Sequence, residues 1–217
     1  MNTSNANISI TLWGAGTVRT LRPIWVAEEL GLKYQLNPIG PRTGETLTPE
    51  YTALNPKQKV PFCEDGEFKL SESMAICRYL VNSYGNEFTL QAPASIEQQA
   101  KQDEWLSFIY GELDETSLYV MRRHGALAES YGEAPAAMVA ARDYVIRQLA
   151  VVEKRLQHND YLLDEGFCLA DLFLTTCLNW VLGYEIPMPA CLHTYRERIL
   201  ERPAYQRAAE INQNKNQ

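Results

Sequence analysis

The spacing of apolar residues changes once along this chain of 217 residues, and that change limits what the chain can fold into. From Ile8 to Leu12, apolar residues alternate with polar ones, which is the period of two expected of a β-strand. After Ile96, only the three- and four-residue spacing of amphipathic helices recurs. The sequence therefore predicts a mixed α/β domain at residues 1–85, a linker at 86–95 and an all-helical domain at 96–217.

Turn residues divide the first domain into short elements. Gly31 follows the apolar spacing of a helix and is its predicted end, and Asp65-Gly66 between two apolar runs indicates a hairpin. The predicted order is strand, helix, strand, loop, strand, strand and helix, which is the layout of a thioredoxin-like sheet. The predicted ranges are a strand at 8–12, a helix ending at 30, a strand at 34–39, a hairpin within 60–70 and a helix at 71–84.

The most apolar stretch of the chain lies in the second domain. Residues 169–182 are apolar nearly all round, which predicts the buried central helix of a bundle. Asp171 and Asn179 interrupt the stretch, and it is shorter than the roughly 20 residues that a membrane-spanning helix needs. We therefore expect a soluble protein that does not span a membrane.

Charge and cysteine content narrow the class of protein further. The formal net charge is -7 and no Lys/Arg-rich run occurs, so no nucleic-acid surface is expected. The five cysteines and three histidines show neither paired spacing nor metal-ligand spacing, which predicts a reducing compartment and no metal site. The polar N-terminus lacks the features of a secretory signal. These observations predict a cytoplasmic location.

A first chemical signal is Leu70-Ser71-Glu72-Ser73 at the predicted start of a helix. The backbone N–H groups of a helix start lack intrahelical partners, and the helix dipole adds positive potential, so an anion binds there. A serine hydroxyl can donate to a carboxylate, and Glu72 can accept from an ammonium group. A γ-glutamyl group carries both charges on one carbon. The alternative is that these residues only cap the helix.

Two further signals flank the first strand and the hairpin. Val60-Pro61 is a place where a cis bond is inexpensive, and a cis turn exposes the Val60 backbone to an extended peptide; the alternative is a conformational lock without a ligand. The segment from Gly14 to Arg22 enters a helix start, where a hydroxyl and the helix dipole can hold a thiolate. Here the alternative is that Thr17 or Thr20 is only the N-cap.

Taken together, these motifs resemble those of a known family. The runs 55–62, 65–66 and 70–80 closely resemble the glutathione-site signature of cytosolic glutathione transferases. The runs 10–14 and 27–32 are similar to the same family, and Gly166-Phe167-Cys168-Leu169-Ala170-Asp171 looks like its signature at the start of the buried helix. The resemblance spans nearly the whole chain and is closest to bacterial, theta-like members. It implies a thioredoxin-like domain followed by a helical bundle.

The resemblance also implies a role for each matching residue. Glu72 and Ser73 would hold the γ-glutamyl end of glutathione. Val60 would pair its backbone with the cysteinyl unit, Pro61 would be the cis residue, and Lys59 would lie near the glycine carboxylate.

The predicted catalytic position is less typical of the family. Thr17 falls where theta-like members carry a catalytic serine or its threonine replacement, and Val18 and Arg19 follow it. A threonine hydroxyl can donate to sulfur, and an arginine charge or backbone amides can also lower the pKa of a thiol from about 8.5. Thr17 and Arg19 are therefore the predicted catalytic residues, with activation by backbone amides or Arg22 as alternatives.

A second departure lies at the buried helix. Cys168 stands where the family usually has Ser or Thr as the N-cap, with Asp171 three residues later. Because cysteine caps poorly, the predicted cost is about 1 kcal/mol of stability. The change concerns folding rather than catalysis.

The function implied by the resemblance is conjugation of the glutathione thiolate to a small hydrophobic electrophile, as in detoxification. The co-substrate would be glutathione, the assembly a homodimer, and the candidate pocket walls Trp13, Tyr110 and Tyr119. One alternative is a glutathione-dependent disulfide reductase or peroxidase, in which the same thiolate attacks sulfur. Another is a non-catalytic glutathione-binding or regulatory protein with the same fold.

Overall fold

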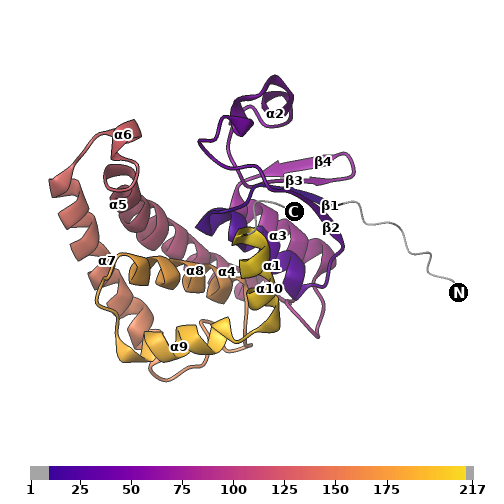
Figure 1. The fold of residues 1–217 in the computed structure, drawn as a ribbon. Helices are drawn as coiled ribbons and strands as arrows, with labels where there is room; N and C mark the ends of the chain where they lie inside the picture. The colour runs from indigo at the N-terminus through magenta and orange to yellow at the C-terminus, as the bar shows by residue number, and fades with distance from the viewer. Residues whose placement is uncertain (1–9, 214–217) are drawn as a thin grey trace, which may run out of the picture. The chain divides into compact units, whose positions relative to one another are not determined.

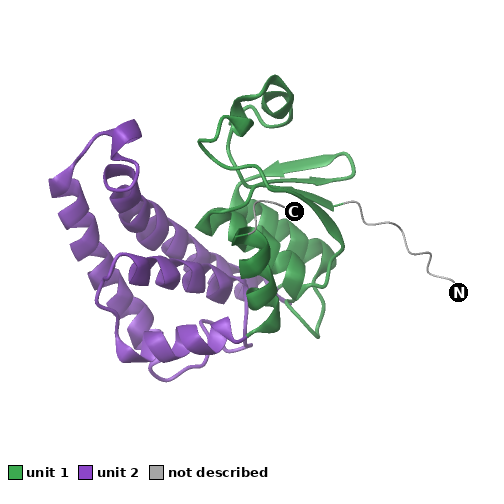
Figure 2. Ribbon diagram, viewed as in Figure 1, with its two compact units in different colours: residues 1–92, 202–217 green, residues 93–201 purple. Residues whose placement is uncertain are grey.

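The computed structural model describes residues 10–213, which form two compact units (Figure 2). Within the described residues, unit 1 consists of residues 10–92 and 202–213, and unit 2 consists of residues 93–201. The junction between Ala92 and Pro93 falls inside the predicted linker. The return of the chain to unit 1 after residue 201 is a feature that helical spacing in the sequence does not reveal.

Unit 1 contains a four-stranded mixed sheet in the order β2-β1-β3-β4 (Figure 1). Strand β1 is parallel to β2, while the β1–β3 and β3–β4 pairs are antiparallel. The predicted thioredoxin-like layout is confirmed, although the second strand ends at Asn37 rather than Ile39. Residues 8 and 9 of the first predicted strand lie outside the described residues. The strands are β1 (Ile10–Trp13), β2 (Tyr34–Asn37), β3 (Phe62–Asp65) and β4 (Phe68–Ser71).

The helices of unit 1 include two from the predicted thioredoxin-like domain that pack on each other. These are α1 (Val18–Glu29), between β1 and β2, and α3 (Ser73–Tyr84), after β4. Ile24, Ile76 and Leu80 are fully buried and form part of the core. The predicted loop before the hairpin contains two short helices, a 3₁₀-helix at Glu45–Leu47 and α2 (Pro49–Leu54).

Helix α10 (Pro203–Gln213) packs on α1 and belongs to unit 1, whereas the sequence predicts that these residues are part of the helical domain. The fully buried Trp25 meets the Tyr205 ring edge-on, with ring centroids 4.8 Å apart. Arg202 donates two hydrogen bonds to Glu29, at 2.7 and 2.8 Å. Arg207 Nε lies 2.7 Å from a carboxylate oxygen of Glu28. These aromatic and ionic contacts hold the helix to α1.

Unit 2 is all-helical, as predicted, and α8 is its buried centre. Every residue from Leu169 to Leu178 is buried, and α8 contacts α4, α9 and the π-helix η2. Within residues 10–213, no helix combines the length and apolar character that crossing a membrane requires. The elements are α4 (Ile96–Phe108), η2 (Ile109–Leu118), α5 (Tyr119–His124), α6 (Ala128–Tyr131), α7 (Pro135–Leu156), α8 (Leu169–Gly183) and α9 (Ala190–Leu200).

The start of α8 is organised by one fully buried carboxylate, Asp171. Its oxygens accept from the Leu162 N–H at 3.0 Å, the Cys168 N–H at 2.9 Å and the Tyr195 hydroxyl at 2.7 Å. The Cys168 thiol donates to the same carboxylate over 3.1 Å. Burial raises the pKa of Asp171, and the hydrogen bonds from these donors act in the opposite direction. The predicted Cys168–Asp171 capping box is therefore present.

Replacing Cys168 by serine is expected to stabilise the protein. A serine oxygen is a better acceptor for the N–H groups of the first turn than sulfur, and it remains able to donate to Asp171. We expect the free energy of unfolding to rise by about 1 kcal/mol, measured by urea denaturation. Cys191→Ser, outside any N-cap position, is the matched control. An unchanged or lower midpoint for Cys168→Ser would contradict the prediction.

Candidate active site

The register of the sheet brings three separate loops of unit 1 to one edge. Trp13 at the end of β1 pairs with Phe62 at the start of β3, and Phe62 pairs with Ser71 at the end of β4. The loop that follows β1, the loop that precedes β3 and the turn that follows β4 therefore leave the sheet at neighbouring positions. Thr17, Val60 and Glu72 lie on these three segments, so the sheet gathers residues that are far apart in the sequence.

The turn after β4 opens directly into helix α3. Glu72 is the N-cap residue and has φ of 75° and ψ of 121°, a conformation that non-glycine residues adopt rarely and mostly at functional sites. The Glu72 side chain makes no capping hydrogen bond to the first turn of α3, where helical N–H groups lack intrahelical partners. Ser73, the first helical residue, is buried beside them. The arrangement suits a carboxylate at the helix start.

Lys57, which is not among the predicted site residues, lies beside Glu72. Lys57 Nζ donates to Glu72 Oε1 at 2.8 Å and to Ser71 Oγ at 2.9 Å. The predicted Lys59 is exposed, and its carbonyl accepts from the Tyr51 hydroxyl at 2.6 Å and from the Asn55 amide at 2.8 Å. Both lysines belong to the same motif, and sequence spacing alone does not tell which one turns towards the helix start.

The segment before β3 presents backbone rather than side chains. The Val60–Pro61 peptide bond is cis, as the resemblance implies. Within residues 10–213, neither the N–H nor the C=O of Val60 takes part in a hydrogen bond. Both groups are therefore available to an extended peptide backbone.

Gly14 allows the loop after β1 to lie against this segment. Its φ is +108°, and a Cβ placed on it would stand 2.5 Å from Val60 Cβ and 2.9 Å from Thr20 Cγ2. The Gly14 N–H donates to the Asn37 carbonyl at 2.8 Å. The loop is thus fixed between β2 on one side and Val60 on the other, and only glycine fits.

Thr17 is the N-cap of α1. Its Oγ1 accepts from the Thr20 N–H at 3.0 Å, and Thr20 Oγ1 accepts from the Thr17 N–H at 3.0 Å. The prediction that Thr17 is the N-cap is therefore confirmed, but capping uses only the oxygen of its hydroxyl group as an acceptor. Because Oγ1 acts as an acceptor in the cap, its own hydrogen remains able to donate, to Thr20 Oγ1 or to a bound group. Arg19 is half-buried in the first turn of α1, and Arg22 is fully buried in the next.

The cysteines of the chain are poor candidates for a protein nucleophile. Burial and two neighbouring carboxylates raise the pKa of Cys63 to about 12. Burial likewise raises the pKa of Cys77, Cys168 and Cys191. Because the thiolate is the nucleophile, the raised pKa values disfavour these four thiols as nucleophiles at neutral pH.

The three predicted walls of an electrophile pocket lie in different elements. Trp13 on β1 donates its indole N–H to Glu64 at 2.8 Å. Tyr119, the first residue of α5, faces the Arg123 guanidinium, which lies 4.5 Å from the ring centroid. Tyr110 lies in η2. Their contact with an electrophile stays a prediction.

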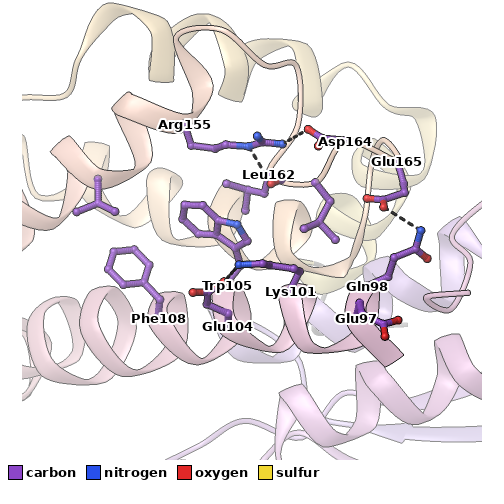
Figure 3. A pocket seen from close by; sticks show the side chains of 12 residues that line it. Glu97, Gln98, Lys101, Glu104, Trp105, Phe108, Arg155, Leu162, Asp164 and Glu165 are labelled. Carbon is purple, nitrogen blue, oxygen red and sulfur yellow. Dashed lines mark hydrogen bonds and ion pairs between the residues drawn. The ribbon is translucent and has the colours of Figure 1, made fainter. Parts of the chain in front are cut away.

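Unit 2 contains a cavity of about 570 Å³ between α4, α7 and residues 162–165 (Figure 3). Trp105 and Phe108 form its aromatic wall, with ring centroids 5.9 Å apart. Its charged groups largely pair with one another, as Arg155 with Asp164 at 2.6 Å. None of the predicted catalytic or glutathione-binding residues is among the residues that line it. Within residues 10–213, no cluster of His, Cys, Asp or Glu side chains is arranged to hold a metal ion.

Both units match models of one enzyme family. Residues 8–82 match the glutathione S-transferase N-terminal domain, and residues 73–203 match the glutathione S-transferase C-terminal domain. The chain belongs to the glutathione S-transferase family.

Similar proteins come from plants, animals and bacteria. Glutathione S-transferase 3 of Zea mays is 30% identical, over 86% of this chain and 86% of its own length. Glutathione S-transferase theta-1 of Mus musculus is 29% identical, over 77% of this chain and 71% of its own. The crystal structure of a theta class glutathione S-transferase from Xanthomonas axonopodis pv. citri, with glutathione bound, is 29% identical and covers 93% of this chain and 97% of its own, with a TM-score of 0.78.

These matches confirm the family and the fold that the sequence predicts, including its theta-like relatives. They also confirm the class of enzyme, glutathione transferase, and the Xanthomonas relative was crystallised with glutathione bound. The matches assign no role to individual residues of this chain.

Proposed function

We propose that glutathione binds along the edge of the unit 1 sheet where the three loops meet. Its γ-glutamyl end occupies the start of α3, where Glu72 accepts from the ammonium group and Ser73 with the first backbone amides donates to the carboxylate. Its cysteinyl unit pairs with the free N–H and C=O of Val60, which Pro61 holds in place. Lys59 lies towards the glycine carboxylate.

The register across Trp13, Phe62 and Ser71 is the observation that carries this proposal. It places the start of α1, the Val60 backbone and the start of α3 at successive positions along one edge. An extended tripeptide whose γ-glutamyl group lies at α3 and whose backbone lies at Val60 has its sulfur directed towards the loop at Gly14. Thr17 and the start of α1 are next to that loop.

Thr17 and the positive end of the α1 dipole then activate the thiol. The Thr17 hydroxyl donates to sulfur, the thiol proton leaves to water, and the dipole stabilises the thiolate. The thiolate forms a carbon–sulfur bond with a small hydrophobic electrophile, whose leaving group departs with the bonding electrons. Arg19, in the first turn of α1, adds positive charge near the same position.

The test is the pKa of the thiol of bound glutathione, measured by ultraviolet titration of the thiolate. We expect a value at least about one unit below the free value of about 8.5 in the wild type. Thr17→Val removes the donor, and the pKa is expected to rise by about one unit, whereas Thr17→Ser keeps the hydroxyl and the low pKa. A low pKa in Thr17→Val would transfer the role to Arg19 or the backbone amides, which Arg19→Ala then separates.

The same titration addresses the alternatives to conjugation. Bound glutathione whose thiol keeps its free pKa would favour a non-catalytic binding protein. If the pKa is lowered, turnover with an aryl halide supports conjugation, and turnover only with a mixed disulfide supports a reductase. We also propose a homodimer located in the cytoplasm, a location that agrees with five cysteines that form no disulfide bond.

A further inference from the structure

The last turn of α10 reaches the loop that enters α1 (Figure 1). Asn212 in this turn is 8% exposed, although it is an amide that usually lies in water. A buried amide is retained where its hydrogen bonds are satisfied, since leaving them unmade costs more than exposing the group.

The Asn212 side chain contacts three successive parts of the α1 entry. Its Oδ1 accepts from the Gly16 N–H at 3.1 Å and from the Thr20 hydroxyl at 2.8 Å. Its Nδ2 donates to the Thr17 carbonyl at 3.1 Å. The Asn212 backbone carbonyl also accepts from the Gly16 N–H, at 2.8 Å. One residue thus holds the loop, the cap and the first turn of the helix.

These contacts determine which acceptor the hydroxyl groups of Thr17 and Thr20 each donate to. Thr20 has a single hydroxyl hydrogen, and Asn212 Oδ1 at 2.8 Å is a nearer acceptor for it than the Thr17 carbonyl at 3.0 Å. Thr20 then donates no hydrogen to Thr17 Oγ1, which still accepts from the Thr20 N–H. The Thr17 hydroxyl is therefore the donor of the pair, and its hydrogen goes to Thr20 Oγ1 at 3.0 Å or to a bound group.

Helix α10 makes other contacts with α1 besides those of Asn212. The Arg202–Glu29 pair and the packing of Tyr205 on Trp25 lie near the other end of α10 and hold it independently. Loss of the Asn212 amide should therefore loosen the entry to α1 without detaching the helix.

We propose that Asn212 is a positioning residue for thiol activation, so that α10 contributes a residue to the glutathione site. It acts through Thr17 and Thr20 rather than by touching glutathione. This inference rests on the proposed function, because it assumes that the Thr17 hydroxyl donates to the sulfur of glutathione.

The experiment compares two substitutions of Asn212 with a neighbouring control. Asn212→Leu removes all three side-chain hydrogen bonds, and Asn212→Asp keeps both accepting positions but sets a carboxylate against the Thr17 carbonyl. Gln213→Ala, at the exposed next residue, is the control. The readouts are the thiol pKa of bound glutathione, the pH profile of kcat/KM, and the affinity for S-methylglutathione, which has no thiol to ionise.

Both Asn212 variants are expected to raise the thiol pKa by about one unit, with a corresponding loss of kcat/KM of about tenfold below that pKa. Asn212→Asp should shift it most, because it adds a negative charge near the thiolate. The affinity for S-methylglutathione should stay within about twofold of the wild type, since the γ-glutamyl and Val60 contacts are intact. Gln213→Ala should match the wild type in all three readouts.

One result would contradict the positioning role of Asn212, and another would contradict the proposed thiol activation. A wild type with a lowered thiol pKa that stays unchanged in both Asn212 variants overturns the positioning role and leaves the proposed function standing. A wild type that binds glutathione without lowering its thiol pKa overturns the proposed thiol activation itself. If Asn212→Leu does not fold, the uncharged Asn212→Ala takes its place, because Asn212→Asp also raises the thiol pKa through its charge.

Discussion

Replacing Asp171 by alanine is expected to destabilise the protein by about 4 kcal/mol, because three strong buried donors lose their acceptor at once. The Leu162 and Cys168 N–H groups and the Tyr195 hydroxyl all donate to this fully buried carboxylate. Each buried donor left without a partner costs about 1–3 kcal/mol. The change is measured as the shift of the urea unfolding midpoint, followed by circular dichroism.

Two further variants make the Asp171 experiment specific. Tyr195→Phe removes one of the donors together with its need for an acceptor, so its cost should be about 1 kcal/mol. Asp164→Ala removes a carboxylate whose side chain is 83% exposed, and it should change stability by less than about 1 kcal/mol. If Asp171→Ala were no more destabilising than Asp164→Ala, the network would not stabilise the start of α8.

Gly14→Ala is expected to be the second most damaging substitution, and it acts on unit 1. The φ of +108° disfavours any side chain, and the new Cβ would meet Val60 Cβ at 2.5 Å, so the backbone has to move. Together, the conformational and steric costs amount to about 2–5 kcal/mol. Because the displaced loop carries Thr17, we also expect a loss of glutathione affinity, measured by calorimetry.

Gly31→Ala is the matched control for this substitution. Gly31 also has a positive φ, of +63°, but no atom lies within 4 Å of the position of its Cβ. It should cost only the conformational part, about 1–2 kcal/mol, and leave glutathione binding unchanged. Equal losses in the two variants would mean that the close approach of Gly14 to Val60 contributes nothing.

The elements that were predicted correctly are those with strong local signals. Asp65-Gly66 between two apolar runs specifies a hairpin through turn chemistry, and the all-round apolar character of residues 169–182 specifies a buried helix. The place of α10 was not predictable in this way. Its helical spacing indicates a buried face but does not say whether that face packs in unit 1 or in unit 2.

The candidate site shows the same limit at the level of single residues. The motifs identified Thr17 and Glu72, because a helix start is visible in the sequence. They did not identify Lys57, whose contact with Glu72 depends on the path of the turn after Asn55. Nor did they identify Asn212, which is 195 residues from Thr17 and resembles any polar residue on a helix surface. Contacts of this separation depend on the tertiary fold.

The division of unit 1 between two distant stretches of chain has a consequence for biosynthesis. A ribosome makes residues 10–92 first, then all of unit 2, and only afterwards residues 203–213. Domains generally fold in the order in which they emerge. The sheet of unit 1 can therefore form early. The hydrogen bonds of Asn212 with Gly16, Thr17 and Thr20 can form only after the helical unit has been synthesised. In a nascent chain the entry to α1 would lack these hydrogen bonds until α10 docks.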